Sequence, residues 1–226
     1  MILAVDGSAT ALFSLVMLLG RLEYRVLKAR SGSDALKLLQ SSTVAVVITD
    51  GALPDMDGAG FLKAMKDSPR CSQIPVIVLL ARSDAALEAA CARLGCAACL
   101  PKSVDPDELY RRIQSLSEAA PRQHIRLATS IRITVGDGTA LGGPERNEQA
   151  TALSEGGLFV QTRYPQPKNA VTPLRMTIEG REIRAKALVL YSSAQGMGMK
   201  FIDLSGVDRD LIREFINKQL VQGIHQ

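Results

Sequence analysis

Two apolar runs in the first half of the chain constrain its fold more than any other feature. Residues 44–49 and 75–80 are rich in β-branched and aliphatic side chains and show no alternation of apolar and polar positions. Such strands are typical of a parallel sheet covered by helices on both faces. Shorter strand-like segments occur at residues 2–5, 24–29 and 97–100. Helical patterns lie between them, at residues 9–22, 31–40, 60–66, 84–94 and 105–116. We therefore expect an α/β, doubly wound, five-stranded parallel sheet.

The pattern changes after residue 118. Pro121 stops the last helix of the first domain, and we assign residues 1–118 to that domain and 119–126 to a linker. Residues 127–226 read as short strands followed by an amphipathic helix at 211–221. The expected strands are residues 131–135, 157–162, 173–178, 183–191 and 197–202. Strands at this spacing favour an all-β small barrel with a C-terminal helix.

Charge and composition exclude several classes of protein. The net charge of +4 arises beyond residue 120, where 14 Lys and Arg face 10 Asp and Glu, so the second half favours an anionic partner. There is no Trp and only 4% aromatic residues, which disfavours nucleic-acid modules that stack bases. No apolar run reaches the roughly 18–20 residues of a membrane span, and the N-terminus lacks a signal-peptide pattern. We expect a cytoplasmic protein with no membrane insertion and no nucleic-acid partner.

The four cysteines lie in the first half. Cys91, Cys96 and Cys99 have a C-x4-C-x2-C spacing that matches an iron–sulfur pattern superficially, with Cys71 upstream as the only further ligand. We interpret them instead as small buried thiols in a reducing compartment, because free cysteine packs as a small hydrophobe.

Charged residues follow the predicted parallel strands at their carboxyl ends, where functional groups collect in such sheets. They are Asp6, Asp50 and Lys102. The segment Ile-Thr-Asp-Gly-Ala-Leu-Pro-Asp-Met-Asp-Gly at 48–58 resembles the phosphoacceptor strand and loop of response-regulator receiver domains. The resemblance covers about residues 1–118 and implies that Asp50 is the phosphoacceptor, with Lys102 as its lysine partner. It also implies a magnesium ion held by Asp6 and Asp50.

The sequence departs from that family at three positions. Gly7 replaces the second acidic residue of the metal site, Leu80 replaces a Thr or Ser, and Cys99 replaces the switching Tyr or Phe. Phosphoryl transfer to a carboxylate needs a cation to offset charge repulsion, so we expect at most a weak magnesium site. A degenerate receiver domain that serves docking or regulation is the favoured interpretation, and a phosphorylatable regulator is the alternative.

Two motifs mark the second half. Arg122 and Arg126 form an R-x-x-x-R pair, and Ala152-Leu-Ser-Glu-Gly-Gly follows 26 residues later. Together they resemble the PilZ domain, a small barrel that binds cyclic di-GMP. In the family pattern [D/N]-x-S-x-x-G, Ser154 and Gly157 match and Ala152 replaces the Asp or Asn that bonds the guanine edge. The resemblance implies a ligand site at Arg122, Arg126, Ser154, Gly156 and Gly157.

The sequence therefore predicts a non-enzymatic signalling adapter that binds cyclic di-GMP through its second domain. Arginine suits this ligand because its planar fork matches phosphate oxygens and the guanine edge. The alternative is a scaffold without ligand that acts through protein contacts. A histidine kinase or a component of motility or exopolysaccharide control is the partner that the resemblance implies, and a homodimer stays open.

Overall fold

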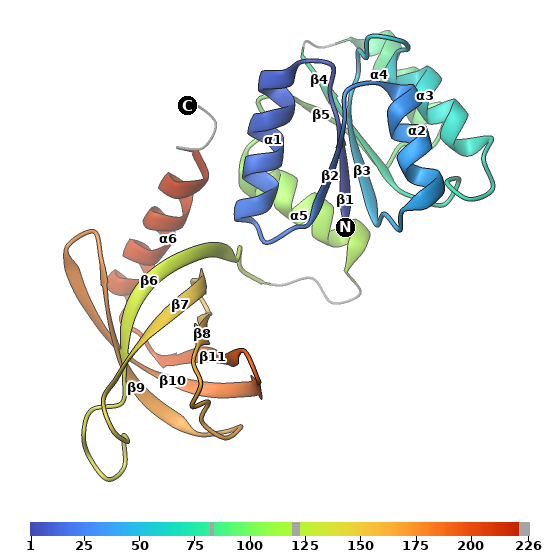
Figure 1. Ribbon diagram of the computed structural model, residues 1–226. Coiled ribbons are helices and arrows are strands. Elements are labelled where there is room, and N and C mark those ends of the chain that lie inside the picture. Colours follow the sequence, from blue (N-terminus) through green and yellow to red (C-terminus); the bar gives the residue numbers. More distant parts are fainter. Residues whose placement is uncertain (82–83, 119–122, 222–226) are drawn as a thin grey trace. The chain divides into compact units, whose positions relative to one another are not determined.

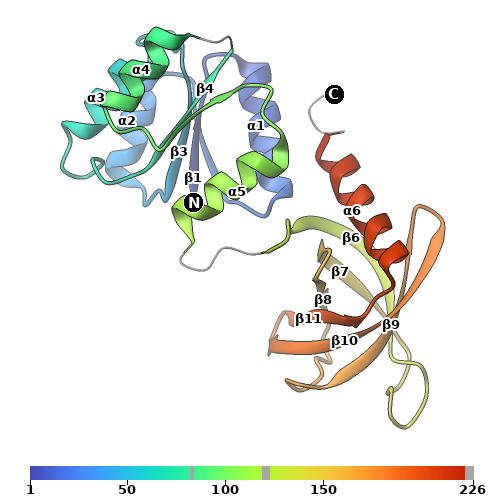
Figure 2. The same ribbon diagram turned by 180° about the vertical axis from the view of Figure 1, so that it is seen from behind.

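The computed structural model describes residues 1–81, 84–118 and 123–221, which form two compact units. One unit is built on a parallel sheet and the other on a closed antiparallel barrel (Figures 1 and 2). Both architectures agree with the expectation from the sequence. Among the described residues, no helix combines the length and the apolar character that crossing a membrane requires.

The first unit contains five parallel strands in the order β2-β1-β3-β4-β5. The strands are β1 (Ile2–Val5), β2 (Val26–Ala29), β3 (Val46–Asp50), β4 (Val76–Leu80) and β5 (Ala98–Pro101). The helices are α1 (Ala9–Arg21), α2 (Gly32–Ser41), α3 (Gly58–Lys66), α4 (Ala85–Arg93) and α5 (Pro106–Ser117). Figure 1 shows α1 and α5 on one face of the sheet and α2, α3 and α4 on the other.

Burial explains why the central strands form where the apolar runs predicted them. Every residue of β1, β3 and β4 is buried, which a strand between two helical layers requires. The helix starts are fixed by side-chain caps: the Ser31 hydroxyl accepts a hydrogen bond from the Asp34 N–H, and Asp57, Asp84 and Asp105 cap α3, α4 and α5 in the same way. These local signals agree with the predicted element order.

The second unit is a six-stranded closed barrel in the order β10-β11-β8-β7-β6-β9. Its strands are β6 (Leu127–Val135), β7 (Arg146–Ser154), β8 (Gly157–Gln161), β9 (Val171–Ile178), β10 (Arg181–Ser193) and β11 (Gly196–Asp203). Helix α6 (Gly206–Val221) follows and contacts β7 and β9. Its buried residues, Ile212, Ile216 and Leu220, lie on the apolar face expected from the sequence.

One barrel strand, β7, is absent from the strands expected from the sequence. Strand β7 carries polar or small residues at most positions, and the inward-facing Ala150 and Leu153 are among its few apolar ones. A barrel interior accepts such small side chains because larger ones from facing strands fill the space. The strand therefore lacks the β-branched signal that identified its neighbours.

Candidate functional site

Three charged residues meet at the carboxyl edge of the parallel sheet. Lys102 Nζ lies 2.8 Å from Asp6 Oδ2 and 2.8 Å from Asp50 Oδ2, so one ammonium neutralises two carboxylates. The side chains of Asp6 and Asp50 are only 6% and 11% exposed. The Lys102 N–H donates to the Leu80 carbonyl oxygen, which fixes the segment after β5 beside β4. The structure thus brings together the three strand-end residues that the sequence singled out.

The environment of Lys102 favours its charged form. Burial alone would lower the pKa of Lys102, but hydrogen bonds to Asp50 and Asp6 outweigh burial and raise that pKa above its ordinary value. The lysine is therefore a permanent cation at neutral pH.

The same cluster fits a divalent cation poorly. Asp6 Oδ1 accepts a hydrogen bond from the Ser8 N–H, and Asp6 Oδ2 is held by Lys102. A Cβ atom at Gly7 would lie 2.8 Å from the Pro54 ring, so a carboxylate there would require the proline to move. In the described part of the chain, no three His, Cys, Asp or Glu side chains are grouped so that they could hold a metal ion. The weak magnesium site at Asp6 and Asp50 stays a prediction.

Leu80 fills the space beside the residue that follows Asp50. A Cβ atom at Gly51 would lie 2.6 Å from Leu80 Cδ2 and 3.2 Å from Leu87 Cδ2. Leu80 is 9% exposed and belongs to the core cluster of the sheet. An apolar side chain packed over Gly51 therefore occupies the strand end, as the sequence indicated for this departure from the receiver pattern, and it links β4 to α4.

The cysteines are all free thiols. Cys71 and Cys91 are buried and Cys96 and Cys99 are half-buried, so burial is complete for only two of the four. Cys99 Sγ lies 3.6 Å from Cys96 Sγ. Burial, followed by the hydrogen bond and charge of Cys96, raises the pKa of Cys99 to about 12. Cys99 is thus a packed thiol on β5.

The second motif forms the hairpin between β7 and β8. Ser154 ends β7, Gly157 begins β8, and the Ser154 hydroxyl donates to the Gly157 carbonyl oxygen at 3.0 Å. A Cβ atom at Gly157 would lie 2.1 Å from the Met199 carbonyl oxygen, so only glycine fits against β11. Arg213 Nη2 binds Glu155 Oε2 at 2.8 Å and thereby anchors the hairpin to α6.

The described part of the arginine arm lies against this hairpin. Arg126 directly precedes Leu127, which pairs with Leu153, so the chain enters the barrel beside the end of β7. A Cβ atom at Gly156 would lie 2.9 Å from the His124 ring, and the Arg126 guanidinium carbon lies 5.9 Å from the centroid of the Phe159 ring. Arg122 lies outside the described residues. Of the predicted ligand residues, Arg126, Ser154, Gly156 and Gly157 are thus close together.

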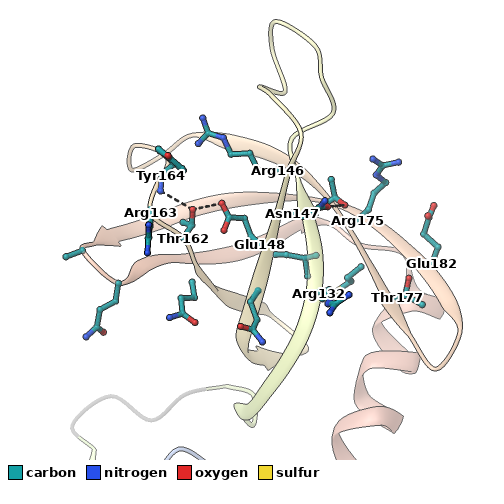
Figure 3. A pocket seen from close by; sticks show the side chains of 17 residues that line it. Arg132, Arg146, Asn147, Glu148, Thr162, Arg163, Tyr164, Arg175, Thr177 and Glu182 are labelled. Carbon is teal, nitrogen blue, oxygen red and sulfur yellow. Dashed lines mark hydrogen bonds between the residues drawn. The ribbon is translucent and has the colours of Figure 1, made fainter.

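A polar groove of about 1560 Å³ lies elsewhere on the same barrel (Figure 3). Its arginines are Arg132, Arg146, Arg163 and Arg175. On the β7–β8 pair its lining reaches Gln149 and Gln161 and includes no motif residue. Arg175 is paired with Glu145 at 2.7 Å, and Arg146 lies over the Tyr164 ring at 4.4 Å. None of the motifs identified in the sequence marks this groove.

Comparisons with known proteins agree with both halves of this geometry. The model of the response regulator receiver domain matches residues 2–114, and the model of the PilZ domain matches residues 119–218. The chain belongs to the response regulator receiver family and carries a PilZ domain. Both domains belong to regulatory families, so this receiver–PilZ chain is a signalling protein.

Relatives of known sequence or structure match the receiver half. The two-component response regulator ORR7 of Oryza sativa is 34% identical over 111 residues, which are 49% of this chain and 53% of ORR7. Response regulator Rre1 of Synechocystis is 33% identical over 94 residues, 42% of this chain and 41% of Rre1. The structure of chemotaxis response regulator CheY4 of Vibrio cholerae is 26% identical with a TM-score of 0.47, over 51% of this chain and 96% of that protein. The chain thus spans about half the length of ORR7 and less of Rre1.

Proposed function

We propose that this receiver–PilZ protein is a receptor for cyclic di-GMP that acts as a signalling adapter. The observation that carries the proposal is the register that pairs Leu127, the residue after Arg126, with Leu153 at the end of β7. This register brings the arginine arm beside the hairpin that contains Ser154, Gly156 and Gly157. The PilZ match covers all of these residues and Arg122. An anionic dinucleotide suits a domain in which basic residues outnumber acidic ones.

The chemistry of each residue supports this role. Arg126 offers a guanidinium that can bind a phosphate or the N7 and O6 atoms of guanine in a bidentate way. Gly156 and Gly157 let the His124 ring and the Met199 carbonyl oxygen pack closely against the hairpin, which holds the hairpin beside the arginine arm. Ala152 has no polar side-chain atom, so one guanine contact of the family is absent. That loss costs about 1–3 kcal/mol, or about ten- to a hundredfold in affinity.

Calorimetric titration of the full chain with cyclic di-GMP tests the proposal. We expect a Kd of about 1 μM or lower, and at least about tenfold weaker binding for Arg122→Ala and for Arg126→Ala, since a hydrogen bond to a charged group contributes about 1.5–3 kcal/mol. Arg184→Ala is the matched control, because Arg184 is exposed and pairs with Glu182 on the same strand. Absence of binding, or equal losses in the control, would overturn the proposal.

For the receiver domain we infer a docking or regulatory role in place of an ordinary phosphorylation switch. The support is the neutralisation of Asp6 and Asp50 by Lys102 and the packing of Leu80 over Gly51. Incubation with acetyl phosphate and intact-mass detection, with Asp50→Asn as control, tests this inference. A phosphoryl adduct on the natural chain that is lost in Asp50→Asn would favour the phosphorylatable regulator.

The remaining expectations belong to the same proposal. The protein partner would be a histidine kinase or a component of motility or exopolysaccharide control, the location would be the cytoplasm, and a homodimer is one assembly to test. The domain limits 1–118, 119–126 and 127–226 are the ones we propose for designing variants.

A further inference from the structure

A transverse row of residues crosses five strands of the barrel next to the arginine arm. The hydrogen-bond registers pair Ala128 with Ala152, Ala152 with Phe159, Phe159 with Gly198, and Gly198 with Tyr191. Residues directly opposite one another on neighbouring strands share one face of a sheet. Buried Leu153 and Leu158 form the next pair and fill the interior. The row therefore lies on the outer face, where Ala152 is only 1% exposed and Tyr191 is an exposed member.

Two aromatic rings dominate this row. Tyr191 lies on Gly198, where a Cβ atom would be 2.3 Å from Tyr191 Cε1 and 2.5 Å from Tyr191 Cζ. The rings of Phe159 and Tyr191 have centroids 6.3 Å apart and are tilted by 32°. Tyr191 is 47% exposed. The glycine therefore lets the tyrosine fold down beside Phe159 and form an apolar platform that solvent reaches.

The platform is continuous with the proposed ligand site. The Arg126 guanidinium carbon lies 5.9 Å from the centroid of the Phe159 ring, within the range of a cation–π contact. Ala152, which replaces the Asp or Asn of the family motif, is the register partner of Phe159. The Asp or Asn contact to the guanine edge is absent at Ala152, and the neighbouring strand β8 places the Phe159 ring directly beside that position.

Edge contacts and stacking have different consequences for selectivity. A polar side chain on the base edge distinguishes guanine from adenine, because the two bases present different donors and acceptors. Stacking on an aromatic ring tolerates any base, since every base has a π face. A site that loses the edge contact and keeps the platform therefore binds purines with little discrimination.

We propose that Phe159 and Tyr191 form a stacking platform for a purine base, and that this protein accepts adenine-containing as well as guanine-containing cyclic dinucleotides. This inference rests on the proposed function, because it concerns the base recognition of the same site. The ligand class is a purine cyclic dinucleotide whose phosphates meet the arginine arm.

Titrations of the full chain with cyclic di-GMP, the mixed guanine–adenine cyclic dinucleotide and cyclic di-AMP test the inference. We expect the three affinities to lie within about tenfold of one another. Tyr191→Leu should weaken all three by about ten- to a hundredfold, the usual effect of losing a stacking residue. Ala152→Asn should increase the preference for cyclic di-GMP by about tenfold or more, because it restores a polar group for the guanine edge. Since Ala152 is 1% exposed, a thermal melt of this variant is compared with that of the natural chain.

Tyr164→Leu is the matched control. Tyr164 is also an exposed tyrosine with an arginine over its ring, at 4.4 Å from Arg146, but it lies at the polar groove. We expect unchanged affinities for this variant. Quenching of tyrosine fluorescence by ligand should persist in Tyr164→Leu and decrease in Tyr191→Leu, and thermal melts identify any variant that fails to fold.

The outcomes separate the two proposals. If no cyclic dinucleotide binds the natural chain or Ala152→Asn, the proposed function fails and this inference fails with it. If cyclic di-GMP binds through Arg126 but cyclic di-AMP binds more than a hundredfold more weakly, or Tyr191→Leu behaves like the control, the receptor stands and the platform is refuted.

Discussion

Replacement of Lys102 by Met removes the one ammonium that neutralises two buried carboxylates. Asp6 Oδ2 and Asp50 Oδ2 each lie 2.8 Å from Lys102 Nζ, and their side chains are 6% and 11% exposed. Removing one partner of a buried ion pair costs about 3–5 kcal/mol, because a charge stays behind without compensation. Since the Lys102 side chain is 28% exposed, we expect the lower end for Lys102→Met, about 3 kcal/mol.

Hydrogen exchange measured by mass spectrometry on the full chain is the suitable assay, because it reports the stability of each part of a chain that has two compact units. A loss of about 3 kcal/mol lowers the protection of the slowest amides in β1 and β3 by about two orders of magnitude. Lys37→Met is the control, since Lys37 pairs with Asp34 at 3.5 Å with both side chains mostly exposed. We expect less than about 0.5 kcal/mol there.

The dependence of stability on pH gives an independent check on the stabilising contribution of Lys102. The pKa of Lys102 is raised in the folded state above 10.5, so its stabilising contribution is complete below pH 10.5 and is lost as the pH rises through the folded-state value. The difference between Lys102→Met and the natural chain should therefore be constant from pH 7 to pH 9. Equal protection in the two proteins would refute the idea that these carboxylates depend on Lys102.

Three further predictions concern other parts of the chain. Gly157→Ala should lower the melting temperature of the barrel far more than Gly198→Ala in calorimetric scans. The new Cβ atom would meet the Met199 backbone in the first variant, but only the movable Tyr191 ring in the second. Equal shifts in melting temperature would contradict this. Alkylation with iodoacetamide at pH 8 should leave Cys99 unmodified in the folded protein, because burial raises the pKa of Cys99 to about 12; rapid labelling in peptide maps would count against it. Hydrogen bonds from the Ser33 and Gly32 N–H groups lower the pKa of Asp55. Asp55→Ala should therefore destabilise α2 above pH 3.8, and the difference in stability from the natural chain should vanish as the pH falls through the lowered pKa. Circular dichroism as a function of pH measures this difference.

The parallel half could be predicted from the sequence because its signals are local. Strands β3 and β4 are buried on both faces, and that burial appears directly as apolar runs without alternation. The convergence of Asp6, Asp50 and Lys102 followed from the rule that parallel strands end at one edge of a sheet. The contact of Leu80 with Gly51 did not follow, since it depends on side-chain packing between a strand end and α4.

The barrel half was harder to predict because its site depends on register. Strand β7 was not expected from the sequence. The row from Ala128 to Tyr191 joins residues far apart in the chain through four strand pairings. Irregularities between Ala150 and Ala152 and between Val189 and Tyr191 shift those pairings by a residue. A one-residue shift moves side chains to the opposite face, so no sequence pattern alone could place Phe159 beside Tyr191.

Gly157 has a structural role in the barrel that does not depend on ligand binding. The glycine allows β8 to pass so close to the Met199 carbonyl that any side chain would collide with it. A barrel of this shape therefore needs glycine at that position whether or not a nucleotide ever reaches the hairpin. In this chain the glycine therefore serves the closure of the barrel, whereas the proposed ligand site depends on Arg126 and on the residue at position 152.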